Sequence, residues 1–418
     1  MQNTDMPNDW TVKKLGEFLE ITSCKRVHEA DWTDHGVPFY RARELVALHD
    51  NQPIDPLFIS EDLYLKNTKV SGEIQPGDLL VTGVGTIGVQ YLVKPGDRFY
   101  FKDGNIIWLK NNKKIDGRFL YYSFDNWFIR KQILHDAGVG TVGTYTIDNA
   151  KKTKIMLPPI EEQKKIAEIL GTWDRAIEEL TGLIAEKKEL KRGLMQQLLT
   201  GTQRLPGFNK PWNNTKLGDI GIITSAGVDK KSIEGEKAVK LLNYMDVYKK
   251  DFLFASDVNM DVTASDRQIV NCNLKKGDVF FTPSSETRDD IAHSAVVMED
   301  VIGGVYSYHI IRLRPTIEID IKYTAYAFKT GMFYKQAYAL CEGSGQRYVL
   351  SQNYFRNMKI YIPSDPAEQQ AIADVLSKAD SEIDLLNQQL DVLREQKRGL
   401  MQKLLTGEIR VKVDTDEQ

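Results

Sequence analysis

The sequence predicts a mixed α/β protein: two globular domains with curved, mostly antiparallel sheets, related by a pseudo-twofold duplication and separated by two long antiparallel coiled-coil helices. Three observations lead to this fold class. A segment of about 40 residues occurs twice, its apolar residues have helical spacing, and the regions around it are dense in short strand-like runs. The length of 418 residues is enough for two or three domains.

The repeat is strongest in the helical segments. Residues Glu162–Gly201 align with Glu368–Gly407 without a gap at an offset of 206, with 19 identities in 40 positions. Elsewhere the match is fainter: Trp10 matches Trp212, and a Gly-Asp pair followed by Thr recurs in both halves. We therefore interpret the chain as a tandem duplication in which the helices stayed alike and the globular parts diverged.

This repeat sets the expected domain boundaries. They are a first globular domain at residues 1–157, a helical segment at 158–203, a second globular domain at 204–362, a second helical segment at 363–410 and a C-terminal tail at 411–418.

The apolar residues of both helical segments follow the 3-4 spacing of a coiled-coil seam. One helix cannot bury such a stripe alone, so two equivalent copies predict an antiparallel pair with pseudo-twofold symmetry. Lys191 and Lys397 occupy the same seam position, where each either extends to solvent or serves to fix the register of the pair or to contact a partner. The predicted seam residues are Ile166, Leu170, Trp173, Ile177, Leu180, Ile184, Ile372, Leu376, Ile383, Leu386, Leu390 and Leu393.

Short apolar runs bounded by turn signals predict the strands of each globular domain. These runs cover residues 76–82, 89–101 and 105–110 in the first half, and 275–282 and 307–314 in the second. Aromatic-rich helices are expected at 119–134 and 323–340. We expect their rings to pack in the core, although stacking on bases is an alternative.

Composition excludes several classes of protein. The chain has 55 basic and 58 acidic residues, and neither globular half is basic enough to bind phosphates by bulk charge. No apolar run is long enough to span a membrane, and the N-terminus lacks a signal pattern, so we expect a cytoplasmic protein. The three scattered cysteines indicate neither a disulfide framework nor a metal site.

Two glycine-rich motifs need an interpretation. Gly83–Gly88 fits the GxGxxG pattern, but a hairpin pattern follows it, and a dinucleotide site requires a helix there. Gly138–Gly143 is either a set of turns or a loop whose amides approach phosphates. The sequence contains no HExxH, P-loop, GxSxG or Asn/Asp-Pro-Pro-aromatic motif, so we expect neither a catalytic site nor a metal site.

The block LPPIEEQKKIAEIL with KRGLMQQLLTG, and its second copy ending in KRGLMQKLLTG, resembles the conserved regions of type I restriction–modification specificity subunits. The repeated Trp, KLG, ITS and GD…T elements resemble the target recognition domains of that family. The resemblance covers residues 8–410. It implies a non-catalytic subunit whose two recognition domains each read one half of a split double-stranded DNA target.

The resemblance also implies partners. The helices would set the spacing of the half-sites and dock two methylation subunits, which use S-adenosylmethionine, and restriction subunits that use ATP and Mg²⁺ can join. No cofactor is expected in this chain. The alternatives are a coiled-coil scaffold with two ligand- or peptide-binding modules and no DNA role, or an enzyme that binds a nucleotide at the Gly83 loop.

Candidate base-reading residues follow from the chemistry of base edges. Arginine pairs well with guanine, and asparagine or glutamine with adenine, while lysine contacts phosphates. Arg41 aligns with Asn243, which would suit different bases in the two half-sites. The candidates are Lys25, Arg26, Arg41, Arg43, Thr86 and Tyr145 in the first domain, and Lys230, Lys231, Asn243, Ser285, Arg288, Arg347 and Tyr348 in the second.

Overall fold

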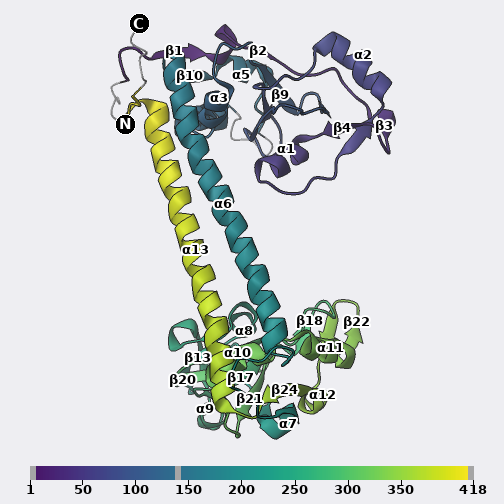
Figure 1. Ribbon diagram of the computed structural model, residues 1–418, viewed down its shortest axis with the longest axis vertical. Coiled ribbons are helices and arrows are strands. Elements are labelled where there is room, and N and C mark those ends of the chain that lie inside the picture. Colours follow the sequence, from purple (N-terminus) through teal and green to yellow (C-terminus); the bar gives the residue numbers. More distant parts are fainter. Residues whose placement is uncertain (1–5, 137–142, 413–418) are drawn as a thin grey trace. The chain divides into compact units, whose positions relative to one another are not determined.

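The computed structural model describes residues 6–136 and 143–412, and the chain divides into two compact units. Unit 1 comprises residues 1–181 with 389–418, and unit 2 comprises residues 182–388. Strands and helices are mixed within each unit, as Figure 1 shows. The predicted mixed α/β class is therefore confirmed.

The described residues of unit 1 form three sheets. The first has the order β2 (Glu20–Thr22), β9 (Ile106–Lys110), β6 (Leu79–Thr82), β7 (Gln90–Leu92). The second has the order β3 (Trp32–Thr33), β5 (Leu57–Ile59), β4 (Val37–Tyr40), β8 (Tyr100–Phe101), and β1 (Thr11–Lys14) pairs with β10 (Lys154–Leu157). The shorter helices are α1 (Ala42–His49), α2 (Glu61–Ser71), α3 (Gly117–Ser123), α4 (Trp127–Asp136) and α5 (Ile147–Lys152).

Unit 2 contains four sheets. The largest has the order β12 (Gly221–Thr224), β21 (Ile311–Pro315), β17 (Val279–Phe281), β19 (Ser294–Val297), β14 (Phe252–Leu253). The others are β15 (Met260–Ala264), β13 (Lys237–Leu242), β20 (Val301–Tyr306), β16 (Asn273–Leu274); β18 (Ser284–Ser285), β23 (Arg347–Val349), β22 (Glu342–Ser344); and β11 (Trp212–Lys216) with β24 (Lys359–Pro363). The shorter helices are α7 (Leu217–Ile220), α8 (Tyr244–Lys249), α9 (Asp266–Asn271), α10 (Ile321–Ala327), α11 (Gly331–Leu340) and α12 (Gln352–Asn357).

Most strand pairs are antiparallel, as the sequence predicts, but in the part of the chain that the structure describes three pairs are parallel: β4 with β8, β13 with β20, and β14 with β19. The strands of each unit also divide over separate small sheets, whereas the sequence pattern suggests a continuous curved sheet in each domain. Short strands with many turns between them give the chain frequent opportunities to leave one sheet for another.

The repeated Gly-Asp motif forms a turn with a buried aspartate before β6 in unit 1 and before β17 in unit 2. Gly77 and Gly277 have φ values of 95° and 87°, which glycine adopts without a Cβ clash. The Asp78 carboxylate accepts hydrogen bonds from the backbone N–H groups of Gln75 and Asn111, at 2.9 and 2.8 Å. This motif therefore recurs in both halves because it builds the core, whatever each domain binds.

The aromatic segments differ from the prediction in one respect. Each forms two short helices, α3 and α4 or α10 and α11, where the periodicity suggests one helix. Side-chain caps start the second helix of each pair: the Asn126 Oδ1 atom accepts from the Phe128 N–H at 2.7 Å, and the Thr330 Oγ1 atom accepts from the Phe333 N–H at 3.2 Å.

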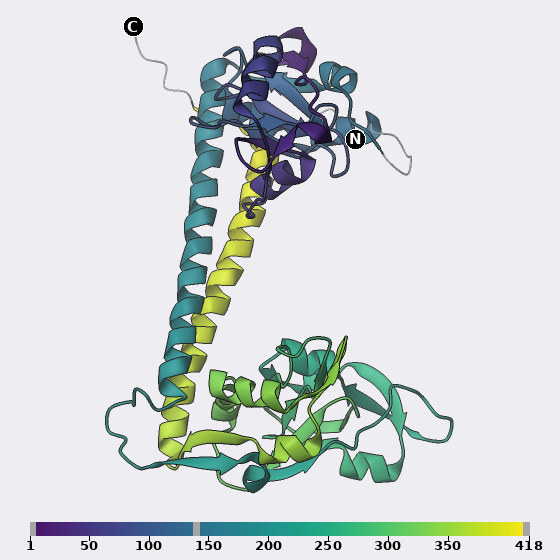
Figure 2. The same cartoon turned by 90° about the vertical axis from the view of Figure 1, so that its right-hand side faces the viewer.

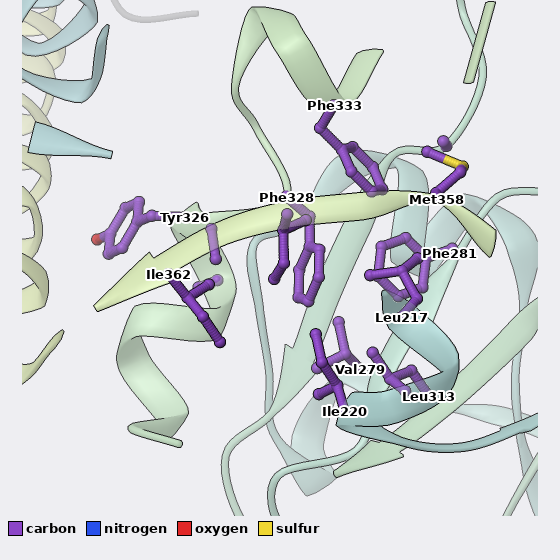
Figure 3. Packing of buried hydrophobic residues seen from close by; sticks show 14 of the residues in the cluster. Leu217, Ile220, Val279, Phe281, Leu313, Tyr326, Phe328, Phe333, Met358 and Ile362 are labelled. Carbon is purple, nitrogen blue, oxygen red and sulfur yellow. The ribbon is translucent and has the colours of Figure 1, made fainter. Parts of the chain in front are cut away.

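The expected role of these aromatic residues in the core is confirmed. Phe281 of β17 is 1% exposed and lies 5.0 Å from Phe328 and 4.7 Å from Phe355, measured between ring centroids. Figure 3 shows Phe281, Phe328 and Phe333 converging between the helices and the sheet. Edge-to-face contacts of this kind add to the energy of apolar burial, so this cluster stabilises unit 2.

The two long helices are α6 (Ile160–Leu198) and α13 (Pro366–Thr406). In unit 1 the N-terminal part of α6 lies beside the C-terminal part of α13, as both views show (Figures 1 and 2). Every predicted seam residue is buried or half-buried, whereas Leu190 and Leu385, outside the seam, are 57% and 54% exposed. Among the described residues, no helix is long and apolar enough to cross a membrane.

Candidate nucleic-acid interface

Arg41 and Arg43 are held together at the start of α1 by one buried carboxylate. The Glu44 side chain is 2% exposed, and its Oε1 atom lies 2.7 Å from Arg41 Nη2 and 2.6 Å from Arg43 Nε. Burial alone would raise the pKa of the Glu44 carboxyl, but hydrogen bonds from the two arginines outweigh it, so the pKa lies below its ordinary value. The pair of guanidinium groups is thus fixed in place, with Arg43 66% exposed.

Lys25 and Arg26 lie near the same edge of unit 1. Both are exposed, and Arg26 Nε lies 2.8 Å from Asp103 Oδ2. Because Tyr40 pairs with Phe101 in the β4–β8 ladder, Arg41 and Asp103 lie one and two residues beyond the ends of neighbouring strands. The structure therefore brings four of the six candidates in this domain to the end of β8.

The Thr86 loop joins β6 and β7, which pair with Val81 opposite Gln90. The hairpin predicted within residues 89–101 is wrong, because its two strands, β7 and β8, belong to different sheets. Thr86 itself is exposed, and its carbonyl oxygen accepts a hydrogen bond from the Thr82 hydroxyl. A strand and not a helix follows the glycines, so this loop lacks the helix N-terminus that a dinucleotide site uses.

Tyr145 does not lie at the surface. It is 2% exposed, and its hydroxyl and the Thr153 hydroxyl oxygen are 2.7 Å apart inside the core. Its backbone N–H donates to the Gly83 carbonyl oxygen at 2.8 Å, so the residue supports the Thr86 loop from within. The expectation that its side chain faces DNA is corrected by this burial. Residues 138–142 of the second glycine motif lie outside the described residues.

Asn243 occupies the same place in unit 2 as Arg41 in unit 1. Each is the N-cap residue of its helix, α8 or α1, and its backbone N–H donates at 2.9 Å to the acidic side chain three residues later. The Asn243 amide oxygen accepts from the Tyr244 N–H at 2.8 Å and is half-buried. Lys230 and Lys231 are exposed, and Lys231 Nζ lies 2.7 Å from Asp229 Oδ2.

The other candidates of unit 2 lie around one open groove of about 480 Å³. Ser285 and Arg347 line it, and Ser285 pairs with Tyr348 in the β18–β23 ladder. The Arg288 guanidinium lies over the Tyr348 ring, 5.5 Å from its centroid. The structure therefore brings Ser285 and Arg288 together with Arg347 and Tyr348, a pair that lies far from them in the sequence.

The groove contains residues that the sequence analysis missed. Tyr244 and Tyr248 of α8 line one wall, with ring centroids 6.1 Å apart. The Tyr248 hydroxyl donates to Asp290 at 3.1 Å, a bond that raises the pKa of the tyrosine, and His293 Nε2 lies 2.8 Å from Asp290 Oδ1. Tyr244 and Tyr248 lie more than 40 positions before Asp290 and His293 in the sequence, and no sequence motif shows that the two pairs meet.

Each unit connects its globular part to the long helices by the same contacts. In unit 2, the Tyr326 hydroxyl donates to Asp380 Oδ2 at 2.7 Å, and Lys191 pairs with the same carboxylate. In unit 1, the Tyr122 hydroxyl donates to Asp174 Oδ2 at 2.5 Å and Lys397 pairs with it. Lys191 and Lys397 are therefore paired across the helices, and the alternative in which they extend to solvent is wrong.

A second pair of contacts surrounds a buried carboxylate in each unit. Glu368 is 0% exposed and accepts from Arg204 Nε at 2.8 Å and from the Trp212 indole at 3.2 Å. Glu162 accepts from Arg410 Nε at 2.7 Å and from the Trp10 indole at 3.0 Å. The match between Trp10 and Trp212 in the sequence is explained by this shared contact.

Comparisons with known proteins agree with these observations. Residues 7–190 and 209–395 each match the model of a family described as the type I restriction modification DNA specificity domain. The type I restriction enzyme MjaVIII specificity subunit of Methanocaldococcus jannaschii is 25% identical over 449 residues, which cover 99% of this chain and 96% of that protein.

Solved structures show the same fold. The crystal structure of the HsdS subunit from Thermoanaerobacter tengcongensis superposes with a TM-score of 0.54 at 17% identity, covering 97% of this chain and 99% of that one. A chain from a study of complex assembly and conformational transition in the type I R-M system gives a TM-score of 0.64 at 17% identity, covering 97% and 100%. Among the described residues, no group of three or more acidic, histidine or cysteine side chains is arranged to hold a metal ion.

Proposed function

Because this chain belongs to the family of type I restriction–modification DNA specificity domains, we propose that units 1 and 2 each read one half of a split DNA target. The observation that carries this proposal is the double match to the specificity domain, one copy over each globular part. Each copy also presents side chains of the types that read base edges, on loops at its surface.

The divergence of the two sets of candidates supports two different half-sites. At equivalent N-cap positions unit 1 has Arg41 and unit 2 has Asn243, which match guanine and adenine respectively. Within unit 1, Arg41 and Arg43 both pair with the buried Glu44 carboxylate, which fixes the direction of their guanidinium groups before DNA binds. Fixed donors lose less conformational entropy on binding, so they favour discrimination between bases.

The helices are proposed to form an antiparallel coiled coil that sets the distance between the half-sites. The pairs Asp174 with Lys397 and Lys191 with Asp380 support this arrangement, since they interchange under the offset of 206 that relates the two repeats. The 39 residues of α6 span about 58 Å at the rise of an α-helix, compared with about 34 Å for one turn of DNA.

The weak overall charge supports a role as one part of a larger complex. Phosphate contacts supply most of the non-specific affinity for DNA, and this chain has a net charge of -3. We propose that two methylation subunits dock on the helices, use S-adenosylmethionine and complete the contacts to phosphates. Restriction subunits that use ATP and Mg²⁺ would join the same complex, and the chain itself would carry no catalytic step.

The proposal is tested by assembling the full chain with its methylation subunits and mapping the methylated adenines in DNA. The expected result is a single bipartite sequence with a fixed spacer, and binding that weakens steeply as salt increases. Arg43→Ala is expected to relax one half of this sequence only. Methylation without sequence preference, or no DNA binding by the complex, would contradict the proposal and favour the scaffold alternative.

A further inference from the structure

The β22–β23 hairpin of unit 2 has the dimensions and the side chains of an element that enters the DNA major groove. The turn between Ser344 and Arg347 contains two residues, Gly345 and Gln346, and Gly345 has a φ of 69°. Glycine with positive φ at the first turn position is typical of the tight type II′ hairpin. The major groove is about 12 Å wide and accommodates a two-stranded ribbon of this kind.

The two faces of this ribbon have different roles. Tyr348 packs against the hydrophobic core of unit 2 and lies under the Arg288 guanidinium. Side chains alternate along a strand, so Arg347 and its cross-strand partner Ser344 are on the opposite face from Tyr348. Residues 342–347 are all exposed, which leaves this face and the tip open to a ligand.

Arg347 and Gln346 differ from the candidate arginines of unit 1 in being unpaired. Among the described residues, neither side chain has a hydrogen-bond or ion-pair partner. Arg26, Arg41 and Arg43 are all paired with carboxylates. To contact a base, each of these arginines must either release its carboxylate or bind the base and the carboxylate together. The Arg347 and Gln346 side chains have no carboxylate partner to release, so their N–H donors are available to hydrogen-bond base edges.

The position of the ribbon is fixed by the rest of unit 2. Its strand β23 also pairs with β18, and the backbone N–H of Leu350 donates to the Pro283 carbonyl oxygen at 2.7 Å. A Cβ atom on Gly343 would lie 2.1 Å from the Arg347 carbonyl oxygen, so only glycine allows the two strands to approach there. The tip is therefore presented on a braced, short ribbon and not on a free loop.

We propose that the β22–β23 ribbon inserts into the major groove of the half-site read by unit 2, where Arg347 specifies a guanine and Gln346 a neighbouring adenine. This inference rests on the proposed function, and it names the β22–β23 ribbon as the element of unit 2 that contacts the bases. Arginine is the usual bidentate partner of guanine O6 and N7, and glutamine of adenine N6 and N7. The groove beside the tip, lined by Tyr244 and Ser285, would lie next to the flanking backbone.

The test uses the full chain in the assembled methyltransferase complex, first as wild type to define both half-sites. Arg347→Ala is expected to reduce the preference for guanine at one position of one half-site by roughly 10-fold to 100-fold, and Gln346→Ala to relax an adjacent adenine. The other half-site should be unchanged in both variants. Arg267→Ala is the matched control, because Arg267 is an exposed arginine of the same unit on α9.

The outcomes separate this proposal from the function on which it rests. If the wild-type complex reads a bipartite target but Arg347→Ala and Gln346→Ala leave both half-sites unchanged, the ribbon does not read bases and the function stands. Uniform weakening for all sequences, beyond any effect of Arg267→Ala, would make Arg347 a phosphate contact and also overturn the proposal. If the wild-type complex has no sequence preference, both proposals fail together.

Discussion

Two tyrosines of α10, Tyr323 and Tyr326, should respond in opposite ways to the same substitution. Both rings are 0% exposed, so replacing either residue with phenylalanine preserves the apolar packing. The Tyr326 hydroxyl donates to Asp380 of α13 at 2.7 Å, whereas the Tyr323 hydroxyl has no partner among the described residues. The hydroxyl therefore stabilises unit 2 at one position and costs free energy at the other.

The magnitudes follow from the partners. A hydrogen bond to a charged group contributes about 1.5–3 kcal/mol, and Asp380, 28% exposed and also paired with Lys191, favours the lower limit. We therefore expect Tyr326→Phe to destabilise unit 2 by about 1.5 kcal/mol. Tyr323→Phe removes a buried polar group without a partner and should be neutral or stabilising by about 1 kcal/mol.

The assay is thermal unfolding of the full chain, measured by calorimetry. For a unit of this size, about 1 kcal/mol shifts the Tm by roughly 2–4 °C, so Tyr326→Phe should lower the Tm of unit 2 by about 3–6 °C. Tyr323→Phe should leave the Tm unchanged or raise it. Equal shifts for both variants, or a larger loss for Tyr323→Phe, would refute the assignment of the Tyr326 contact.

Three further predictions concern other parts of the chain. Phe281→Ala should lower the free energy of unfolding of unit 2 by about 3–5 kcal/mol in urea titrations, since its 1% exposed ring leaves a cavity; a loss below 1 kcal/mol would contradict the packing. Lys191→Asp should lower the Tm, and adding Asp380→Lys should recover part of the loss, because it restores the ion pair but removes the acceptor of the Tyr326 hydroxyl; no recovery would show that the pair does not fix the helices. Burial raises the pKa of the Cys24 thiol to about 12, so Cys24 should resist iodoacetamide at pH 8 by mass spectrometry, and rapid alkylation of native protein would count against this burial.

Local patterns were enough to predict the two long helices and several of the strands. Heptad spacing gave the positions of α6 and α13, because an apolar stripe at this period has few other ways to be buried. The strands around residues 79–82 and 279–281 follow from apolar runs that begin after a Gly-Asp turn. These are short-range relations, so the sequence alone contains them.

The assignment of surface side chains depended on contacts that the sequence does not contain. Tyr145 resembles a loop residue in its glycine-rich surroundings, yet its pairing with Gly83 places the ring in the core. Arg41 and Arg43 share Glu44, a neighbour in sequence, but only the burial of that carboxylate shows that their direction is fixed. The sequence could identify arginine and tyrosine side chains as candidates for DNA contacts, but it could not show which of these side chains face solvent.

The sequence by itself determined the duplication, the two long helices and membership of a family that reads DNA, since these rest on periodicity and identity along the chain. The tertiary structure alone decided that Lys191 and Lys397 pair with carboxylates on the facing helix, and that Ser285 and Arg347 line one groove. The physical reason is distance along the chain. Contacts between residues far apart in sequence depend on how strands and helices pack, and local propensity does not encode that packing.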